Sequence, residues 1–206
     1  MEDVRELKEL QLDALREVAN IGAGHAATAL SQMTNRTIMI AVPEVNVRAL
    51  EDVTDLVGSG DEVMAAVLMH MMGDLTGRTL VLFQAESARA LCDILMRREP
   101  GTTREFGVME QSGLKEAGNI LASAYLNALS DFMGMMLVPS VPSLVVDLSA
   151  AVLTSAYLNF GHARDFVFCV ETAFRVENTS APLVGHFLLL PDMPSLRAIF
   201  DAIRLT

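Results

Sequence analysis

The chain repeats itself, and this constrains its fold more than any other feature. LREVANIGAG at 15–24 matches LKEAGNILAS at 114–123, an offset of 99 residues that also aligns Pro43 with Pro142. A second match, at an offset of 108, aligns SARAL at 87–91 with SLRAI at 195–199. The second half has therefore gained nine residues between the two matches. We expect two equivalent repeats, 1–104 and 105–206, in one compact unit.

Each half has the pattern of a long helix, several strands and a closing helix. Ala, Leu and Glu at helical spacing indicate the helices, and β-branched or apolar runs between turn residues indicate the strands. The predicted helices are 7–33, 86–98, 105–133 and 194–204, and the predicted strands are 37–49, 62–72, 77–84, 135–145, 165–176 and 182–190. We assign the added residues to a short extra helix within 146–157. The last two strands are expected to be connected by a turn at ENTSAP, 177–182.

Either half alone would leave an apolar face uncovered, so we expect the two halves to share one sheet. The predicted fold class is α/β (α+β), an internally duplicated pseudo-two-fold domain with two long motif-bearing helices.

Composition excludes several classes of protein. With 51% hydrophobic and 20% charged residues, the chain has the apolar content of an ordered, soluble protein. A net charge of −11 repels phosphate backbones and anionic lipid, so neither nucleic acid nor a membrane is an expected partner. The two cysteines, Cys92 and Cys169, lie in apolar segments without metal-ligand spacing, and the charged N-terminus does not resemble a signal peptide. We expect a cytoplasmic protein with reduced thiols.

Both long helices carry the same polar stripe. At about 100° per residue, Asp13, Glu17, Asn20 and Gly24 lie within about 60° of one another on the first helix. The second helix repeats the layout with Ser112, Glu116, Asn119 and Ser123. Such a stripe is usually only a solvated helix face. Asn, however, is a poor residue for a helix interior, so its retention in both halves indicates that its amide is used.

Other chemistry lacks support in the sequence. There is no GxSxG elbow and no HExxH, and the four histidines are scattered without ligand spacing, so we expect neither a nucleophilic hydrolase nor a metal site. Gly22-Ala23-Gly24 lies within a predicted helix, where it is better suited to close helix packing than to nucleotide binding.

The two stripes can be written Asp13-x3-Glu17-x2-Asn20-x22-Pro43 and Ser112-x3-Glu116-x2-Asn119-x22-Pro142. This pattern resembles the signature of the CheC, CheX and FliY family of chemotaxis phosphatases. Two signatures on about 200 residues are most similar to the CheC members, which often have Asn at the position of His25. CheX-like chains carry one signature, and FliY chains add a flagellar-switch domain.

The resemblance implies a substrate, the response regulator CheY phosphorylated on an aspartate, and a mechanism. Asn20 or Asn119 would hold the attacking water in line, while Glu17 or Glu116 would pair with a receiver lysine. The Mg²⁺ would belong to CheY, with no cofactor in this chain. Asp13 and Ser112 are weaker candidates for docking, and Pro43 and Pro142 are expected to shape the strands near each helix.

The resemblance also implies a second partner, the receptor deamidase CheD. Its candidate contact is Asp147, at the start of the extra helix, although VDLSAAVLTSAY could equally fill the core. We expect a monomer, because a duplicated chain has less need to dimerise than a single-copy relative. The alternative function is a non-catalytic adaptor of the FliM/FliN switch type that binds CheY-phosphate without hydrolysing it.

Overall fold

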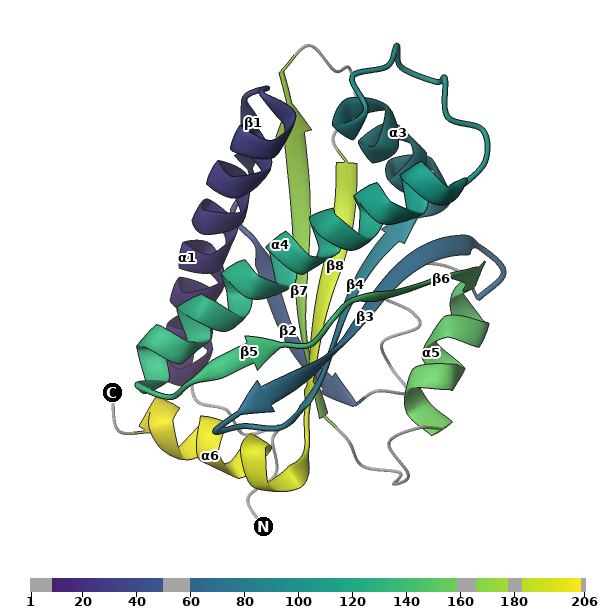
Figure 1. The fold of residues 1–206 in the computed structure, drawn as a ribbon. Coiled ribbons are helices and arrows are strands. Elements are labelled where there is room, and N and C mark those ends of the chain that lie inside the picture. Colours follow the sequence, from purple (N-terminus) through teal and green to yellow (C-terminus); the bar gives the residue numbers. More distant parts are fainter. Residues whose placement is uncertain (1–8, 50–59, 159–165, 178–182, 205–206) are drawn as a thin grey trace.

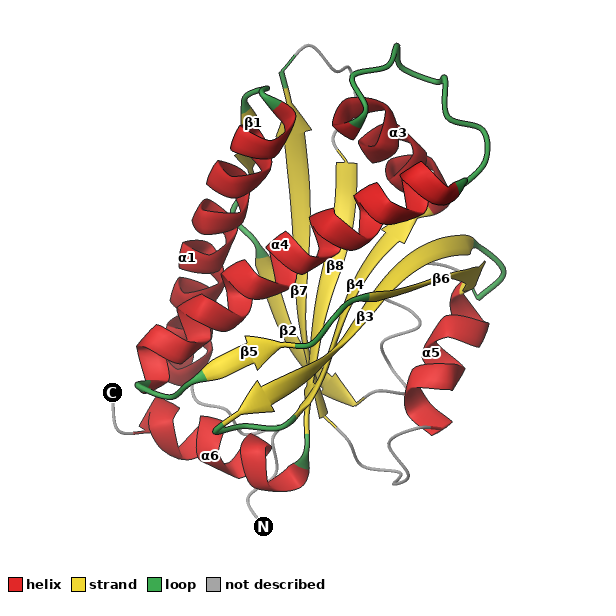
Figure 2. Cartoon of the chain, viewed as in Figure 1, coloured by secondary structure: helices red, strands yellow, loops and turns green. Residues whose placement is uncertain are grey.

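One antiparallel sheet of eight strands forms the centre of the molecule (Figures 1 and 2). The computed structural model describes residues 9–49, 60–158, 166–177 and 183–204. Its helices are α1 (Glu9–Thr34), α3 (Ala85–Leu95), α4 (Val108–Met133), α5 (Ser149–Leu158) and α6 (Met193–Arg204). Its strands are β1 (Ile38–Ile40), β2 (Glu44–Ala49), β3 (Val63–Gly73), β4 (Gly77–Gln84), β5 (Leu137–Pro139), β6 (Ser143–Leu148), β7 (Phe166–Val176) and β8 (Leu183–Pro191).

The two halves interlock in this sheet. The first half's β1 and β2 pair with β7 of the second half, and the second half's β5 and β6 pair with β3 of the first. In the middle, β4 pairs with β8, and Leu80 lies opposite Leu188, its own equivalent at the offset of 108. A pseudo-two-fold axis therefore passes between these two buried leucines. The predicted shared sheet is confirmed, and the residue boundary between the repeats stays a prediction.

The registers show where the added residues lie. Glu44 pairs with Glu171, while Ser143, the equivalent of Glu44 at an offset of 99, pairs with Leu68. Leu68 and Glu171 are thus equivalent at an offset of 103. Four added residues therefore precede β7, and the other five lie between β7 and β8. The prediction that all nine lie within 146–157 is wrong, although α5 does form there. The predicted turn at 177–182 falls mostly on 178–182, which lie outside the described residues.

Two predicted strands are divided by proline. Instead of continuous strands at 37–49 and 135–145, the structure has β1 followed by β2 and β5 followed by β6. Pro43 and Pro142 lie in the two interruptions, because proline has no N–H to donate to a sheet. This agrees with the strand-shaping role expected of them. The predicted helix 86–98 instead ends at Leu95, and Arg97 then adopts a left-handed conformation with φ of 55°.

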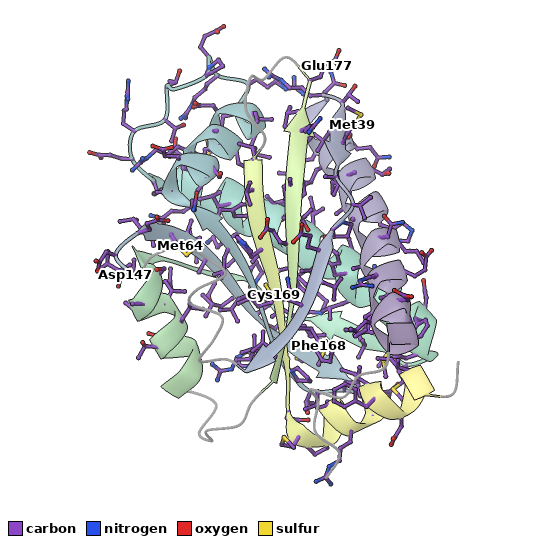
Figure 3. The ribbon with its side chains drawn as sticks, turned by 180° about the vertical axis from the view of Figure 1, so that it is seen from behind. Met39, Met64, Asp147, Phe168, Cys169 and Glu177 are labelled. Atoms are coloured by element: carbon purple, nitrogen blue, oxygen red, sulfur yellow. The ribbon has the colours of Figure 1, made fainter. Side chains whose placement is uncertain are left out.

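Helices cover both faces of the sheet. On one face α1 and α4 cross the strands, with α3 and α6 beside them (Figure 1). On the other face α5 contributes Val152 and Leu153 to a smaller apolar cluster that includes Met64 and Cys169 (Figure 3). Both cysteines are buried, as expected, and no disulfide bond joins them within the described residues. Among the described helices, none is long and apolar enough to cross a membrane.

Candidate functional site

The predicted stripe on α1 faces outward. Asp13, Glu17, Asn20 and Gly24 are all exposed, whereas Leu15 on the opposite side is buried. Gly22 and Ala26 are also buried, and Ala29 and Met33 are partly so, because at about 100° per residue they lie opposite the stripe. Within the described residues, the side chains of Glu17 and Asn20 have no hydrogen-bond partner, so the carboxylate and the amide are both available to a visiting protein.

The stripe on α4 has the same orientation but lies in a more sheltered position. Ser112 and Glu116 are exposed, while Asn119 and Ser123 are half-buried. The opposite side of the helix packs inward, as the helical period requires. Leu114, Leu121, Tyr125 and Ala128 are buried there, and Phe132 is half-buried. No described residue forms a hydrogen bond with the side chains of Glu116 or Asn119. Both polar pairs can therefore be reached from outside.

The two stripes differ in their neighbouring charges. Arg16 Nη1 donates to Asp13 Oδ1 at 2.7 Å, and both side chains are more than half exposed. Ser112 and Lys115 occupy the equivalent positions in the second half, where the described residues form no such ion pair. An exposed pair of this kind contributes little stability. Asp13 thus has an ion-pair partner that Ser112 lacks, and a docking role for either residue stays a prediction.

The relative placement of the two helices depends on Gly22 and Tyr125. A Cβ atom at Gly22 would lie 2.6 Å from Cδ1 and 3.1 Å from Cα of Tyr125, so only glycine permits this approach. The Tyr125 ring stacks on Phe187 with ring centroids 4.7 Å apart, and its hydroxyl shares a 2.6 Å hydrogen bond with Thr172. Burial raises the pKa of Tyr125 to about 12. The packing role expected of the glycine segment is thus confirmed for Gly22, whereas Gly24 faces open space.

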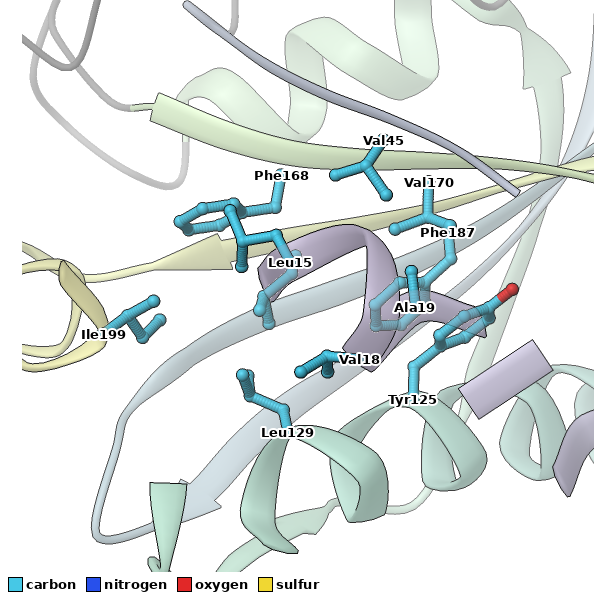
Figure 4. A pocket seen from close by; sticks show the side chains of 11 residues that line it. Leu15, Val18, Ala19, Val45, Tyr125, Leu129, Phe168, Val170, Phe187 and Ile199 are labelled. Atoms are coloured by element: carbon cyan, nitrogen blue, oxygen red, sulfur yellow. The ribbon is translucent and has the colours of Figure 1, made fainter. Parts of the chain in front are cut away.

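The two helices are seated differently on the sheet. Gly118 of α4 lies directly against β3, where an added Cβ would come within 2.7 Å of the Val67 side chain. Ala19 of α1 corresponds to Gly118, and Val170 of β7 corresponds to Val67. These two residues line an apolar cavity of about 40 Å³ (Figure 4). The cavity lies between the inner face of α1 and the sheet, close to the turn that carries Glu17 and Asn20, and Tyr125 and Leu129 of α4 line its other side. The helix that bears the second pair is therefore the more tightly supported.

The contact of Tyr125 with Gly22 and the close packing of Gly118 on Val67 were not anticipated. Tyr125 corresponds to Ala26 and Gly118 to Ala19 at the offset of 99. The sequence signal that could have indicated these contacts is the difference in side-chain volume between equivalent inward-facing residues. The sequence does not reveal which strand residue each one meets.

Other chemistry finds little support. The described residues contain no group of three or more His, Cys, Asp or Glu side chains placed to hold a metal ion. Burial, and then the carboxylates of Glu110 and Asp93, raise the pKa of Cys92 to about 12, so its thiol is not an activated nucleophile. His186 is buried beside Glu171 at 3.2 Å, and burial lowers its pKa. None of these groups lies on the stripes.

Asp147 lies on a strand rather than on a helix. It is exposed on β6, paired with Met64 of β3, and α5 begins only at Ser149 (Figure 3). The extra helix predicted to start near Asp147 begins two residues later, because residues 143–148 pair with β3 and continue the sheet. The segment that follows does fill the core in part, through Val152 and Leu153.

Comparison with known proteins agrees with this geometry. The model of the CheC-like family matches residues 10–47 and again residues 109–146, at the offset of 99 found within the sequence. The CheY-P phosphatase CheC of Bacillus subtilis (strain 168) is 34% identical over 199 residues, covering 96% of this chain and 95% of the relative.

Two solved structures share the fold. Thermotoga maritima FliY has a TM-score of 0.76 at 20% identity, covering 97% of this chain and 98% of that one. The FliM middle domain from H. pylori has a TM-score of 0.62 at 14% identity, covering 95% and 99%. Likeness at these identities concerns the fold, whereas the full-length similarity to the Bacillus subtilis protein and the two model matches concern descent. This chain belongs to the CheC-like family.

Proposed function

We propose that this chain is a chemotaxis phosphatase that hydrolyses the aspartyl phosphate of CheY. The observation that carries the proposal is the pair of Glu and Asn side chains at equivalent positions of α1 and α4, exposed or half-exposed and without partners among the described residues. The relative from Bacillus subtilis, similar over nearly the whole chain, is a CheY-P phosphatase.

An amide suits the chemistry that this substrate needs. An acyl phosphate in a receiver domain already has its Mg²⁺ and lysine, so the enzyme needs to add only an aligned water. The side-chain oxygen of Asn20 or Asn119 accepts a hydrogen bond from that water, and its NH2 group can donate to phosphate oxygens. Phosphoryl transfer depends mainly on such positioning and on electrostatics. We assign no cofactor to this chain, and the Mg²⁺ to CheY.

The glutamates have a docking role in this proposal. Glu17 lies one helical turn before Asn20, and Glu116 one turn before Asn119, so each carboxylate and its amide share one surface. A carboxylate that pairs with the receiver's lysine would hold the amide over the phosphate. Orienting one water is worth roughly 3 kcal/mol, or about a hundredfold in rate. The mechanism requires no general base.

The test is phosphate release from CheY charged with acetyl phosphate. We expect Asn20→Ala and Asn119→Ala each to remove part of the activity and the double variant to remove all of it, because the two sites act independently. Asn127→Ala is the matched control, since Asn127 is also exposed on α4 but lies two turns beyond Asn119. A double variant that releases phosphate at the normal rate would exclude the mechanism.

The alternative is a non-catalytic adaptor that binds CheY-phosphate or a flagellar-switch partner. Its support is the fold shared with the FliM middle domain. The same assay separates the two functions, because an adaptor would bind the charged CheY without accelerating phosphate release. The retention of both Glu/Asn pairs favours the phosphatase, since binding alone does not require an amide at the same place twice.

We also propose CheD as a partner, with Asp147 in its contact surface. Support comes from the exposed edge strand β6, where Val145, Val146 and Leu148 are exposed beside Asp147. We further propose a monomer in the cytoplasm. One chain already carries two pairs, and two buried cysteines that no disulfide joins, Cys92 and Cys169, suit a reducing compartment.

A further inference from the structure

Two large apolar side chains are exposed at the start of α4. Val108 is 85% exposed and Met109 is 67% exposed, and both lie in the first helical turn. Single exposed apolar residues are common on protein surfaces and need no explanation. Val108 and Met109, however, are adjacent and together form a small apolar surface at the start of a helix. We call these two residues the apolar pair.

The apolar pair continues the polar stripe of the same helix. At about 100° per residue, Val108 lies within about 20° of the direction of Asn119, and Met109 lies within about 20° of Glu116. At a rise of 1.5 Å per residue, the separations along the helix axis are about 16 Å and about 10 Å. A typical protein interface covers about 800 Å² of each partner, which corresponds to a contact area about 30 Å in diameter. A partner protein bound over Asn119 would therefore also contact the apolar pair.

The first turn of α4 is anchored by two side-chain hydrogen bonds, one partly buried and one exposed. Glu110 is buried and accepts a hydrogen bond from Arg98 at 2.6 Å, while the Nε2 of Gln111 donates to the carbonyl of Phe106 at 2.8 Å. The apolar pair therefore projects from a fixed turn, and little ordering entropy would be lost when a partner covers it.

The linker before α4 is anchored as well. The carboxylate of Asp93 accepts hydrogen bonds from the backbone N–H groups of Gly101, Thr102 and Thr103, and from the Thr103 hydroxyl at 2.6 Å. Burial by itself would raise the pKa of Asp93, but these hydrogen bonds outweigh it and hold that pKa below the usual range. The linker and the first turn thus form one rigid support for the apolar pair.

The first repeat differs at these positions. Glu9 and Leu10 are the equivalents of Val108 and Met109 at the offset of 99. The first repeat thus has a carboxylate, Glu9, at the position where the second repeat has Val108. The two repeats share the Glu and Asn on which the proposed chemistry depends, but not the surface next to them.

We infer that Val108 and Met109 are docking residues of the second site, where they contact an apolar part of the receiver domain while Asn119 reaches the phosphate. This inference rests on the proposed function. The occupant is the phosphorylated receiver protein, because the pair is continuous with the stripe that would engage its phosphorylation site. The consequence is that the second site binds CheY-phosphate more tightly than the first.

The experiment compares the two sites one at a time. Asn20→Ala leaves only the second site active, and Asn119→Ala leaves only the first. Val108→Glu, which copies Glu9, and Met109→Ser are combined in each background, and kcat and KM are measured by phosphate release. An acidic residue in the first turn of a helix is favourable, so the substitutions should not unfold α4.

We expect KM to rise about tenfold in the Asn20→Ala background with kcat unchanged, and no change in the Asn119→Ala background. An unchanged KM in the first background, or equal changes in both, would overturn the inference while leaving the phosphatase proposal intact. If neither background accelerated phosphate release, the proposed function would fail and the inference with it. A wild-type dimer that the substitutions convert to a monomer would overturn the inference too, and would assign the pair to self-association instead.

Discussion

The crossing of α1 and α4 can be tested by two substitutions that differ only in their surroundings. Gly22 and Gly24 lie two residues apart in α1, and alanine at either position adds one methyl group. At Gly22 that methyl would lie 2.6 Å from Cδ1 of Tyr125, against an ordinary carbon contact of about 3.5–4.0 Å. At Gly24 it would meet nothing within 4 Å. The pair therefore separates the packing effect from the substitution itself.

The expected magnitude follows from these contacts. Replacing glycine by alanine in a helix stabilises it by about 1 kcal/mol, and this gain applies to both variants. Overpacking costs about 1–3 kcal/mol, and relief is difficult because Tyr125 is fixed by Phe187 and Thr172 and because its own Cα lies 3.1 Å from the new methyl. We expect Gly22→Ala to be about 1–3 kcal/mol less stable than Gly24→Ala.

Urea denaturation followed by circular dichroism measures this difference directly. Gly24→Ala should unfold at a higher urea concentration than the wild type, and Gly22→Ala at a clearly lower concentration than Gly24→Ala, with similar slopes. If the two variants had the same midpoint, the helices would not cross as tightly as described, and the reasoning about the placement of the two sites would be refuted.

Two further predictions concern the cavity and the edge strand. Ala19→Val should fill part of the cavity under α1 and stabilise the protein by about 0.5–1 kcal/mol, whereas Gly118→Ala at the equivalent position should destabilise it through contact with Val67. If the urea midpoints of Ala19→Val and Gly118→Ala moved in the same direction, the described difference in packing of α1 and α4 on the sheet would be contradicted. Asp147→Lys should reduce the capture of CheD in a pull-down, and undiminished capture would remove Asp147 from the proposed contact.

Local periodicity and internal comparison together account for the parts of the site that the sequence predicted. Helical spacing decides which side of a helix is apolar, so the order of residues alone placed Glu17, Asn20 and Glu116 outside and Leu114 inside. The repeat then distinguished the Asn from an ordinary surface residue, because it occurs at the matched position of both helices. The need to cover two apolar faces was enough to predict one shared sheet.

Strand pairing was beyond the reach of such arguments. The sequence shows that 37–49 and 135–145 are extended, but not that each pairs with a strand of the other half. Pairing depends on contacts between residues far apart in the chain, and many pairings satisfy the same apolar pattern. The division of these strands at Pro43 and Pro142 could have been predicted, because proline cannot donate to a ladder.

The sequence by itself determined that this chain has two equivalent helices, each with a Glu and an Asn facing outward. Only the tertiary structure decided that the helices are unequally supported, with Gly118 tight against Val67 and Ala19 above a cavity beside Val170. The physical reason is that a helical face follows from the order of residues along one segment. The fit of that face depends on the volumes of side chains contributed by distant strands, which meet only when the whole chain has folded.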